Sequence, residues 1–173
     1  MICNVHLRAL PVPAEVAGAL LDGVAEPGNP VWPTPDWPAL VLDRPLADGA
    51  EGGHGRNRYT CTNYQPGRRV EFTFGPESPF AGTHAFDVLK SGSNACVLRH
   101  AVIATPRDLR GRLQWSLIIR WSHDAMIEDL LDRMAVAVDH PPVRPARWSP
   151  YVRLLRRALG RWKQNQVESA EAR

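Results

Sequence analysis

The chain of 173 residues is 44% hydrophobic and 23% charged, which is typical of one soluble globular domain. A membrane-spanning helix needs about 18 consecutive apolar residues, and the apolar runs of this sequence are far shorter. Its N-terminus lacks the basic and then apolar layout of a signal peptide, so we expect a cytoplasmic protein without an integral membrane segment. The formal net charge of +3 arises in residues 139–173, where eight basic side chains outnumber three acidic ones, and the slightly acidic remainder does not resemble a surface for a nucleic-acid partner.

The first forty residues are predicted to form a strand, a short helix and a loop. Apolar and polar residues alternate over residues 1–8, which favours a strand, and residues 14–24 have the spacing of a helix. Prolines in residues 27–38 exclude a helix or a central strand, so we expect an ordered loop there. Its Trp32 and Trp37 need a surface that buries their rings, and either the mouth of a cavity or the edge of the domain provides one.

Antiparallel strands are predicted over most of residues 39–121. Alternation of apolar and polar residues in this region indicates strands with one covered face. Gln65-Pro-Gly67 is a strong hairpin signal. The glycine-rich segment 46–55 lacks the lysine and the serine or threonine of a phosphate-binding loop, and its His54 is expected to be exposed or to lie at a hinge. The expected strands are residues 39–43, 56–64, 68–74, 82–90, 94–104 and 112–121.

A long helix is predicted from Ser122 to Val138. The order of strand, helix, six strands and long helix predicts an α+β helix-grip fold, in which a curved antiparallel sheet wraps around the long C-terminal helix. His123 and Asp124 start this helix, but adjacent helix residues do not face one another, so we do not expect them to form a base with its orienting acid. Apolar residues recur at the spacing of a face that covers a sheet, namely Ile127, Leu130, Leu131, Met134 and Val138.

The last part of the chain is predicted to be a proline-containing linker followed by a basic amphipathic helix. We therefore divide the chain into residues 1–140, the helix-grip domain, and residues 141–173. The helix is expected over residues 149–163. It can pack on its own domain, join a homodimer or lie on an anionic membrane, and we expect it to pack on protein. Its apolar stripe is Val152, Leu155, Leu159 and Trp162.

The cysteines are predicted to be reduced and buried. Cys3, Cys61 and Cys96 are odd in number and widely spaced, and each lies on the apolar side of its expected strand. The chain has no CxxC or HxxxH spacing, so neither a metal site nor another cofactor is expected.

Two histidines are predicted to point inward from neighbouring strands. His84 shares its side with Phe86, and His100 shares its side with Leu98. Inward imidazoles can act as general acid or base, or each can make one buried hydrogen bond. The candidate catalytic residues are His84, His100 and Tyr59. The residues expected to line a ligand cavity of a few hundred cubic ångströms are Trp32, Trp37, Tyr59, Phe72, Phe74, His84, Phe86, Leu98, His100, Trp115, Ile127, Leu131 and Met134.

The sequence resembles bacterial members of the SRPBCC superfamily, which includes START domains and the polyketide cyclase/dehydrase proteins. The resemblance implies a helix-grip fold with a deep cavity for apolar or aromatic ligands between the sheet and the long helix. No catalytic motif carries over residue by residue. The matching segments are residues 37–46, 52–55, 58–59, 64–67, 72–74, 82–86, 98–100 and 123–132.

Two functions are consistent with these features. The first is binding of a hydrophobic small molecule, either aromatic, polyketide-like or a lipid, without catalysis. The second is a cofactor-free cyclase or aromatase-type enzyme, a lyase or isomerase, that uses the inward histidines as acid and base. We favour binding, because no set of residues in the sequence identifies a catalytic mechanism.

Overall fold

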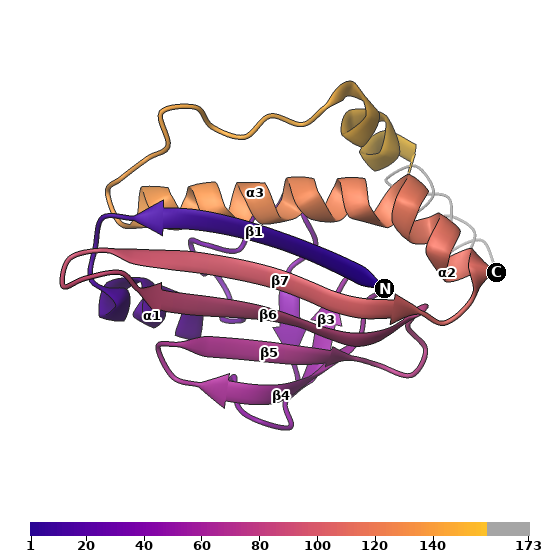
Figure 1. Ribbon diagram of the computed structural model, residues 1–173, viewed down its shortest axis with the longest axis horizontal. Coiled ribbons are helices and arrows are strands. Elements are labelled where there is room, and N and C mark those ends of the chain that lie inside the picture. Colours follow the sequence, from indigo (N-terminus) through magenta and orange to yellow (C-terminus); the bar gives the residue numbers. More distant parts are fainter. Residues whose placement is uncertain (159–173) are drawn as a thin grey trace, which may run out of the picture.

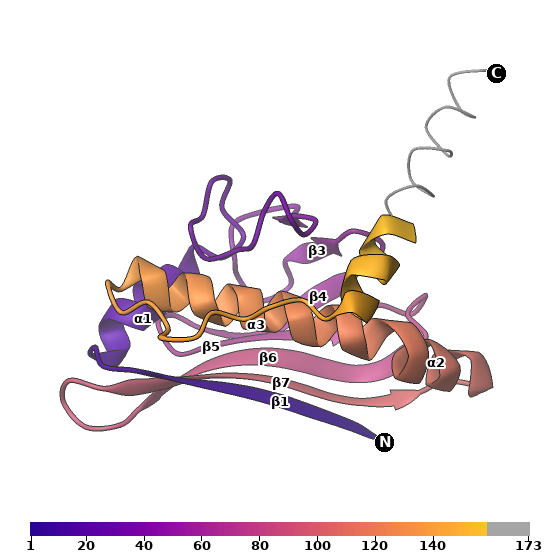
Figure 2. The same cartoon turned by 90° about the horizontal axis from the view of Figure 1, so that it is seen from above.

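The computed structural model describes residues 1–158. The strands form one antiparallel sheet in the order β1-β7-β6-β5-β4-β3-β2, and helix α3 lies across one face of the sheet (Figure 1, Figure 2). This is the α+β helix-grip arrangement predicted from the sequence. The strands are β1 (Ile2–Leu10), β2 (Leu40–Leu42), β3 (Glu51–His54), β4 (Tyr59–Gln65), β5 (Arg69–Phe74), β6 (Phe80–Lys90) and β7 (Cys96–Pro106). The helices are α1 (Ala14–Asp22), α2 (Leu109–Gln114), the π-helical η1 (Trp115–Ile119) and α3 (Arg120–Ala137).

The predicted strand over residues 112–121 is wrong. These residues are part of a continuous helical stretch that begins at Leu109 and runs through η1 into α3. The Asp108 carboxylate caps its start by accepting a hydrogen bond from the Gly111 amide at 2.6 Å. From Leu109 onward leucines recur at every fourth position as far as residue 117. Because a spacing of four keeps side chains on one side of a strand and also on one side of a helix, the pattern does not distinguish the two.

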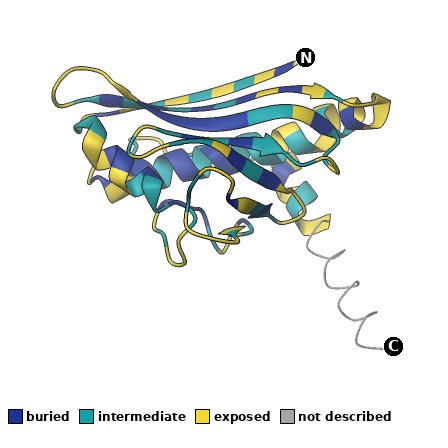
Figure 3. Ribbon diagram, turned by 90° about the horizontal axis from the view of Figure 1, so that it is seen from below, coloured by how far each residue is buried: buried dark blue, intermediate teal, exposed yellow. Residues whose placement is uncertain are grey.

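Strand β1 presents its polar side to α3. Cys3, predicted to be buried, is exposed, and its neighbours Val5 and Leu7 are 47% and 59% exposed. Exposure alternates along β1 in Figure 3. The cause is the register with β7, which places His6 directly opposite the buried His100 on the side that faces α3. As predicted, the other two cysteines are buried.

Two groups of buried apolar side chains fill the space between the sheet and α3. The predicted face of α3 is confirmed, since its apolar residues pack into the larger group together with side chains from β4, β5, β6 and β7. The smaller group lies near the start of the helical stretch and has Trp115 and Ile119 at its edge. Its buried members are Ile2, Phe80, Val102 and Ala104.

The chain after α3 turns back along this helix toward its beginning (Figure 1). Residues 150–158 form a helix, and Val152 is buried in the larger apolar group, as predicted. Leu159 and Trp162, which were expected on the same stripe, lie outside the described residues. Within residues 1–158, no helix is both long and apolar enough to cross a membrane.

The Asp129 carboxylate joins the tryptophan-containing loop to this returning segment. Its Oδ2 atom accepts hydrogen bonds from the indole Nε1 atoms of Trp37 and Trp148, both at 2.7 Å. The two indoles meet edge to face, and the Arg156 guanidinium lies 4.4 Å and 4.8 Å from their ring centroids. Trp37 is therefore buried at the edge of the domain.

Replacing Asp129 by alanine should destabilise the fold and loosen the returning segment. Two indole donors lose a charged acceptor, and we expect the free energy of unfolding to fall by about 2–4 kcal/mol. Denaturant unfolding followed by tryptophan fluorescence measures this change. The matched control is Val136→Ala on the exposed side of the same helix, which should change stability by less than about 0.5 kcal/mol. Equal stability of the two variants would show that Asp129 does not hold the segment.

Candidate functional site

Five of the six histidines of the chain lie in one row between the sheet and α3, which we call the histidine row. Its centroid distances are 5.9 Å from His84 to His100, 5.0 Å from His100 to His123 and 6.1 Å from His123 to His6. At the other end, the Tyr59 ring connects His84 at 4.4 Å to His54 at 5.6 Å. The sixth histidine, His140, is exposed.

Strand register explains how the row forms. In the β6–β7 ladder His84 lies opposite Val102, so its diagonal neighbour His100 points to the same side of the sheet. In the β1–β7 ladder His6 lies opposite His100. His123 comes from α3, on the other side of the layer. The sequence correctly places His84 and His100 inward, where they are 8% and 1% exposed.

Three histidine nitrogens of the row and the neighbouring Ser122 hydroxyl are unsatisfied within the described part of the chain. His84 Nε2, His100 Nδ1, His123 Nδ1 and Ser122 Oγ are buried, and none has a hydrogen-bond partner within residues 1–158. Each such atom costs about 1–3 kcal/mol relative to hydration. Buried polar groups are normally satisfied by protein, water or a ligand, so this layer is a place where a bound molecule would find hydrogen-bonding groups already buried.

Burial keeps most of these imidazoles neutral. Burial is the largest cause that lowers the pKa of His84, His100 and His123, and neighbouring imidazoles lower the first two further. Burial also lowers the pKa of His54 to about 4. It raises the pKa of the Tyr59 phenol, which therefore stays protonated. The row thus offers neutral imidazoles and a phenol at neutral pH.

The predicted aromatic wall is largely assembled. The rings of Phe72 and Phe74 stack on His84, each with a centroid distance of 5.3 Å, and Tyr59 meets the same imidazole edge to face. Trp115 belongs to η1 and not to a strand, and its ring centroid lies 6.0 Å from that of His123. Phe86, Leu98, Ile127, Leu131 and Met134 are buried as expected.

The two loop tryptophans have different environments. Trp32 packs beside His54 at a centroid distance of 5.5 Å, so the expectation that His54 is exposed is wrong. The reason is that this imidazole packs against the rings of both Trp32 and Tyr59. Trp37, by contrast, belongs to the Asp129 cluster.

Two depressions open on the surface away from the row. One, of about 290 Å³, lies where the loop, α3 and the returning segment meet and includes Asp129 and Trp148. The other, of about 380 Å³, is an apolar groove on α2 and η1 that includes Leu109, Leu113 and Leu117. Neither depression includes His84, His100 or Tyr59, whose rings pack against their neighbours.

Sequence reasoning missed His6 as a member of the row. For His6 the signal was available, since Asn4, His6 and Arg8 alternate with the apolar residues of the same strand. Which side of that strand faces the interior depends on its pairing with β7, which the strand alone does not reveal.

Comparisons with known proteins find likeness in structure. No family model matches the sequence, and curated proteins give no match. Norcoclaurine synthase from Thalictrum flavum matches with a TM-score of 0.61 at 10% identity, over 80% of this chain and 95% of that one. CalU16 from Micromonospora echinospora matches with a TM-score of 0.56 at 13% identity, over 90% and 82%. A solution structure from Thermobifida fusca matches with a TM-score of 0.58 at 16% identity, over 82% and 98%.

Identities this low show a shared fold and no more. The resemblance seen in the sequence is thus supported at the level of the helix-grip fold.

Acidification from pH 7.5 to pH 4.5 should destabilise the protein. Histidines of the unfolded chain take up protons near pH 6.5, whereas folded His54 does so only near pH 4 and folded His84 also well below 6.5. The unfolded state therefore binds more protons in this window, and each proton of difference lowers the free energy of unfolding by about 1.4 kcal/mol per pH unit. The raised pKa of His6, caused mainly by its hydrogen bond to Asp124, opposes part of this loss.

Denaturant unfolding at several pH values tests this expectation. His84→Phe keeps a ring of similar size and should reduce the loss of stability on acidification, because one buried titrating group is gone. The control is Val136→Ala on the exposed side of α3, which removes no titrating group and should leave the pH dependence unchanged. A His84→Phe profile parallel to that of the parent protein would contradict the assignment.

Proposed function

We propose that the protein binds a small aromatic or otherwise apolar molecule, bearing at least one hydrogen-bonding group, in the layer between the sheet and α3. The observation that carries the proposal is a set of four buried polar atoms that have no hydrogen-bond partner among residues 1–158 and that lie among aromatic rings. Binding is favoured where a ligand removes apolar area from water and satisfies such atoms at the same time.

The chemistry of the row indicates what such a ligand offers. A neutral imidazole has one donor and one acceptor nitrogen, and the Ser122 hydroxyl can do either. A hydroxyl or carbonyl group on the ligand can therefore pair with the row. The Phe72 and Phe74 faces and the Trp115 indole provide the apolar surroundings. A ligand enters this layer by displacing rings that now touch one another.

The shared fold supports this proposal. One solved structure of norcoclaurine synthase, with a TM-score of 0.59 at 11% identity over 82% of this chain and 90% of that one, is a complex with dopamine and hydroxybenzaldehyde. Both compounds are aromatic and carry hydroxyl groups. The same class of compound is what the histidine row would accept.

A cofactor-free cyclase or aromatase-type enzyme is the second candidate, with His84, His100 and Tyr59 as acid and base. Against it stands the electrostatics of the row. Burial and the neighbouring imidazoles lower the pKa of both His84 and His100, and none of the hydrogen bonds or ion pairs found in residues 1–158 joins either ring to a carboxylate that would stabilise its charged form. A weak base without a stabilised conjugate acid favours binding over proton abstraction.

The protein should bind 2-naphthol and naphthalene with different affinities. Both rings fit apolar surroundings, but only 2-naphthol carries a hydroxyl group for the row, so we expect it to bind about tenfold more tightly, the equivalent of about 1.4 kcal/mol. Titrations followed by NMR chemical shifts of the histidine rings measure both affinities. His84→Phe and His100→Phe should remove the difference while naphthalene binding persists, and His140→Gln should preserve it.

Two results would count against the proposal. One is equal affinity for the two compounds in the parent protein. The other is a titration in which the histidine rings do not shift and changes in backbone amide resonances are confined to the apolar groove on α2 and η1. Turnover of any bound compound that falls about 10²–10⁴-fold in His100→Gln, with affinity unchanged, would instead favour the enzyme.

A further inference from the structure

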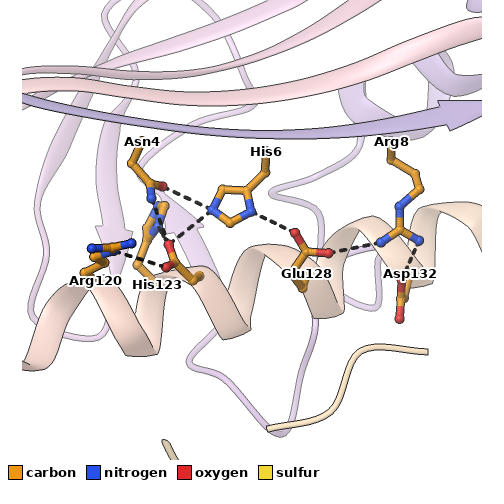
Figure 4. A network of polar contacts seen from close by, with 8 residues as sticks. Asn4, His6, Arg8, Arg120, His123, Glu128 and Asp132 are labelled. Atoms are coloured by element: carbon orange, nitrogen blue, oxygen red, sulfur yellow. Dashed lines mark hydrogen bonds and ion pairs between the residues drawn. The ribbon is translucent and has the colours of Figure 1, made fainter. Parts of the chain in front are cut away.

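Strand β1 and helix α3 face each other through a polar contact at the His6 end of the row. Asn4, His6 and Arg8 point from β1 toward acidic residues of α3 (Figure 4). Successive residues of the same face of a strand meet successive turns of the helix here. The helix contributes His123, Asp124, Glu128 and Asp132.

We infer that His6, His123 and Asp124 form a binding site for one divalent transition-metal ion, of which Zn²⁺ is the representative. One ligand atom from each residue lies within 4.8 Å of the other two. His6 Nε2 is 3.2 Å from Asp124 Oδ1, and His123 Nδ1 is 3.7 Å from the same oxygen. Two ligands at about 2.0–2.2 Å from a tetrahedral zinc ion are about 3.3–3.6 Å apart, so small side-chain movements suffice.

The second imidazole nitrogen of His6 has the partner that a metal ligand needs. His6 Nδ1 lies 2.8 Å from Glu128 Oε1, and Glu128 is held in turn by Arg8 at 3.1 Å. A histidine that donates its other N–H to a carboxylate has its coordinating nitrogen fixed in orientation and made more basic. Glu128 is thus a positioning residue, and Nε2 of His6 remains directed at Asp124.

The His123 nitrogen is the independent observation that points to a ligand. Its Nδ1 atom is buried and has no hydrogen-bond partner within the described residues, and its contact with Asp124 is too long for one. A metal ion between this nitrogen, His6 and Asp124 would satisfy it. Nitrogen and oxygen ligands of this kind suit Zn²⁺, Co²⁺, Ni²⁺ or Fe²⁺ better than Ca²⁺ or Mg²⁺.

Three protein ligands leave one coordination position open. The His100 ring lies 5.0 Å from His123 and 6.5 Å from His6, so the site adjoins the buried part of the row. The existing contacts of Asp124 would rearrange on binding. Asn4 Nδ2 donates to Oδ1 at 2.9 Å, and Arg120 lies 3.7 Å from Oδ2.

Zinc binding to the untagged full-length protein tests the inference. Isothermal titration with Zn²⁺ should give one site, and Co²⁺ should produce the visible absorption of a tetrahedral centre with nitrogen and oxygen ligands. His6→Gln and His123→Gln should each abolish the site, whereas the exposed His140→Gln should preserve it. Glu128→Gln should weaken Zn²⁺ binding about 10–100-fold without removing it.

NMR of the parent protein makes the test independent of whether a variant folds. On addition of Zn²⁺, the ¹⁵N resonances of His6 Nε2 and His123 Nδ1 should shift, and those of His140 should not. A site with more than one ion, shifts at other histidines only, or Zn²⁺ binding that survives both His6→Gln and His123→Gln would overturn the inference. These experiments measure metal binding alone, so a negative result would not contradict the proposed binding of a small molecule.

Discussion

The packing of helix α3 on the sheet is the contact on which the remaining structure depends. One side of α3 buries apolar residues in the larger core group. A second side carries the acidic residues that contact β1. A third side holds the loop and the returning segment through Asp129 and Arg133. The Arg133 guanidinium donates hydrogen bonds to the carbonyl oxygens of Trp32 and Thr34. A single helix therefore fixes the edge strand, the loop and the chain after it.

Local pattern was sufficient to predict the architecture and the inward direction of His84 and His100. Both histidines lie in long strands whose alternation has one interpretation, and apolar residues recur along the long helix at the spacing of one buried face. The region around Trp115 could not be predicted, because leucines spaced by four satisfy two periods. The orientation of β1 could not be predicted either, since it is set by pairing with a strand whose residues lie 86 to 102 positions later.

The composition of the histidine row explains why only part of the site could be predicted from the sequence. Its members come from β1, β3, β6, β7 and α3, and they share no sequence spacing. What they share is their position in a layer that is otherwise mostly apolar, and three of them carry a buried nitrogen that has no hydrogen-bond partner within residues 1–158. Such a layer reduces stability relative to a fully apolar core, and proteins keep arrangements of this kind where function requires them.

The pairing of β1 with β7 also bears on the order in which the chain can fold. Ile2 lies opposite Ala104, and Leu10 lies opposite Cys96. The residues of β1 are thus synthesised nearly a hundred positions before their partner strand, and α3 follows later still. Contacts so far apart in sequence slow the folding of a domain. The hairpins from β4 to β7 can form from neighbouring segments, so the N-terminal strand is expected to be the last strand to join the sheet during synthesis.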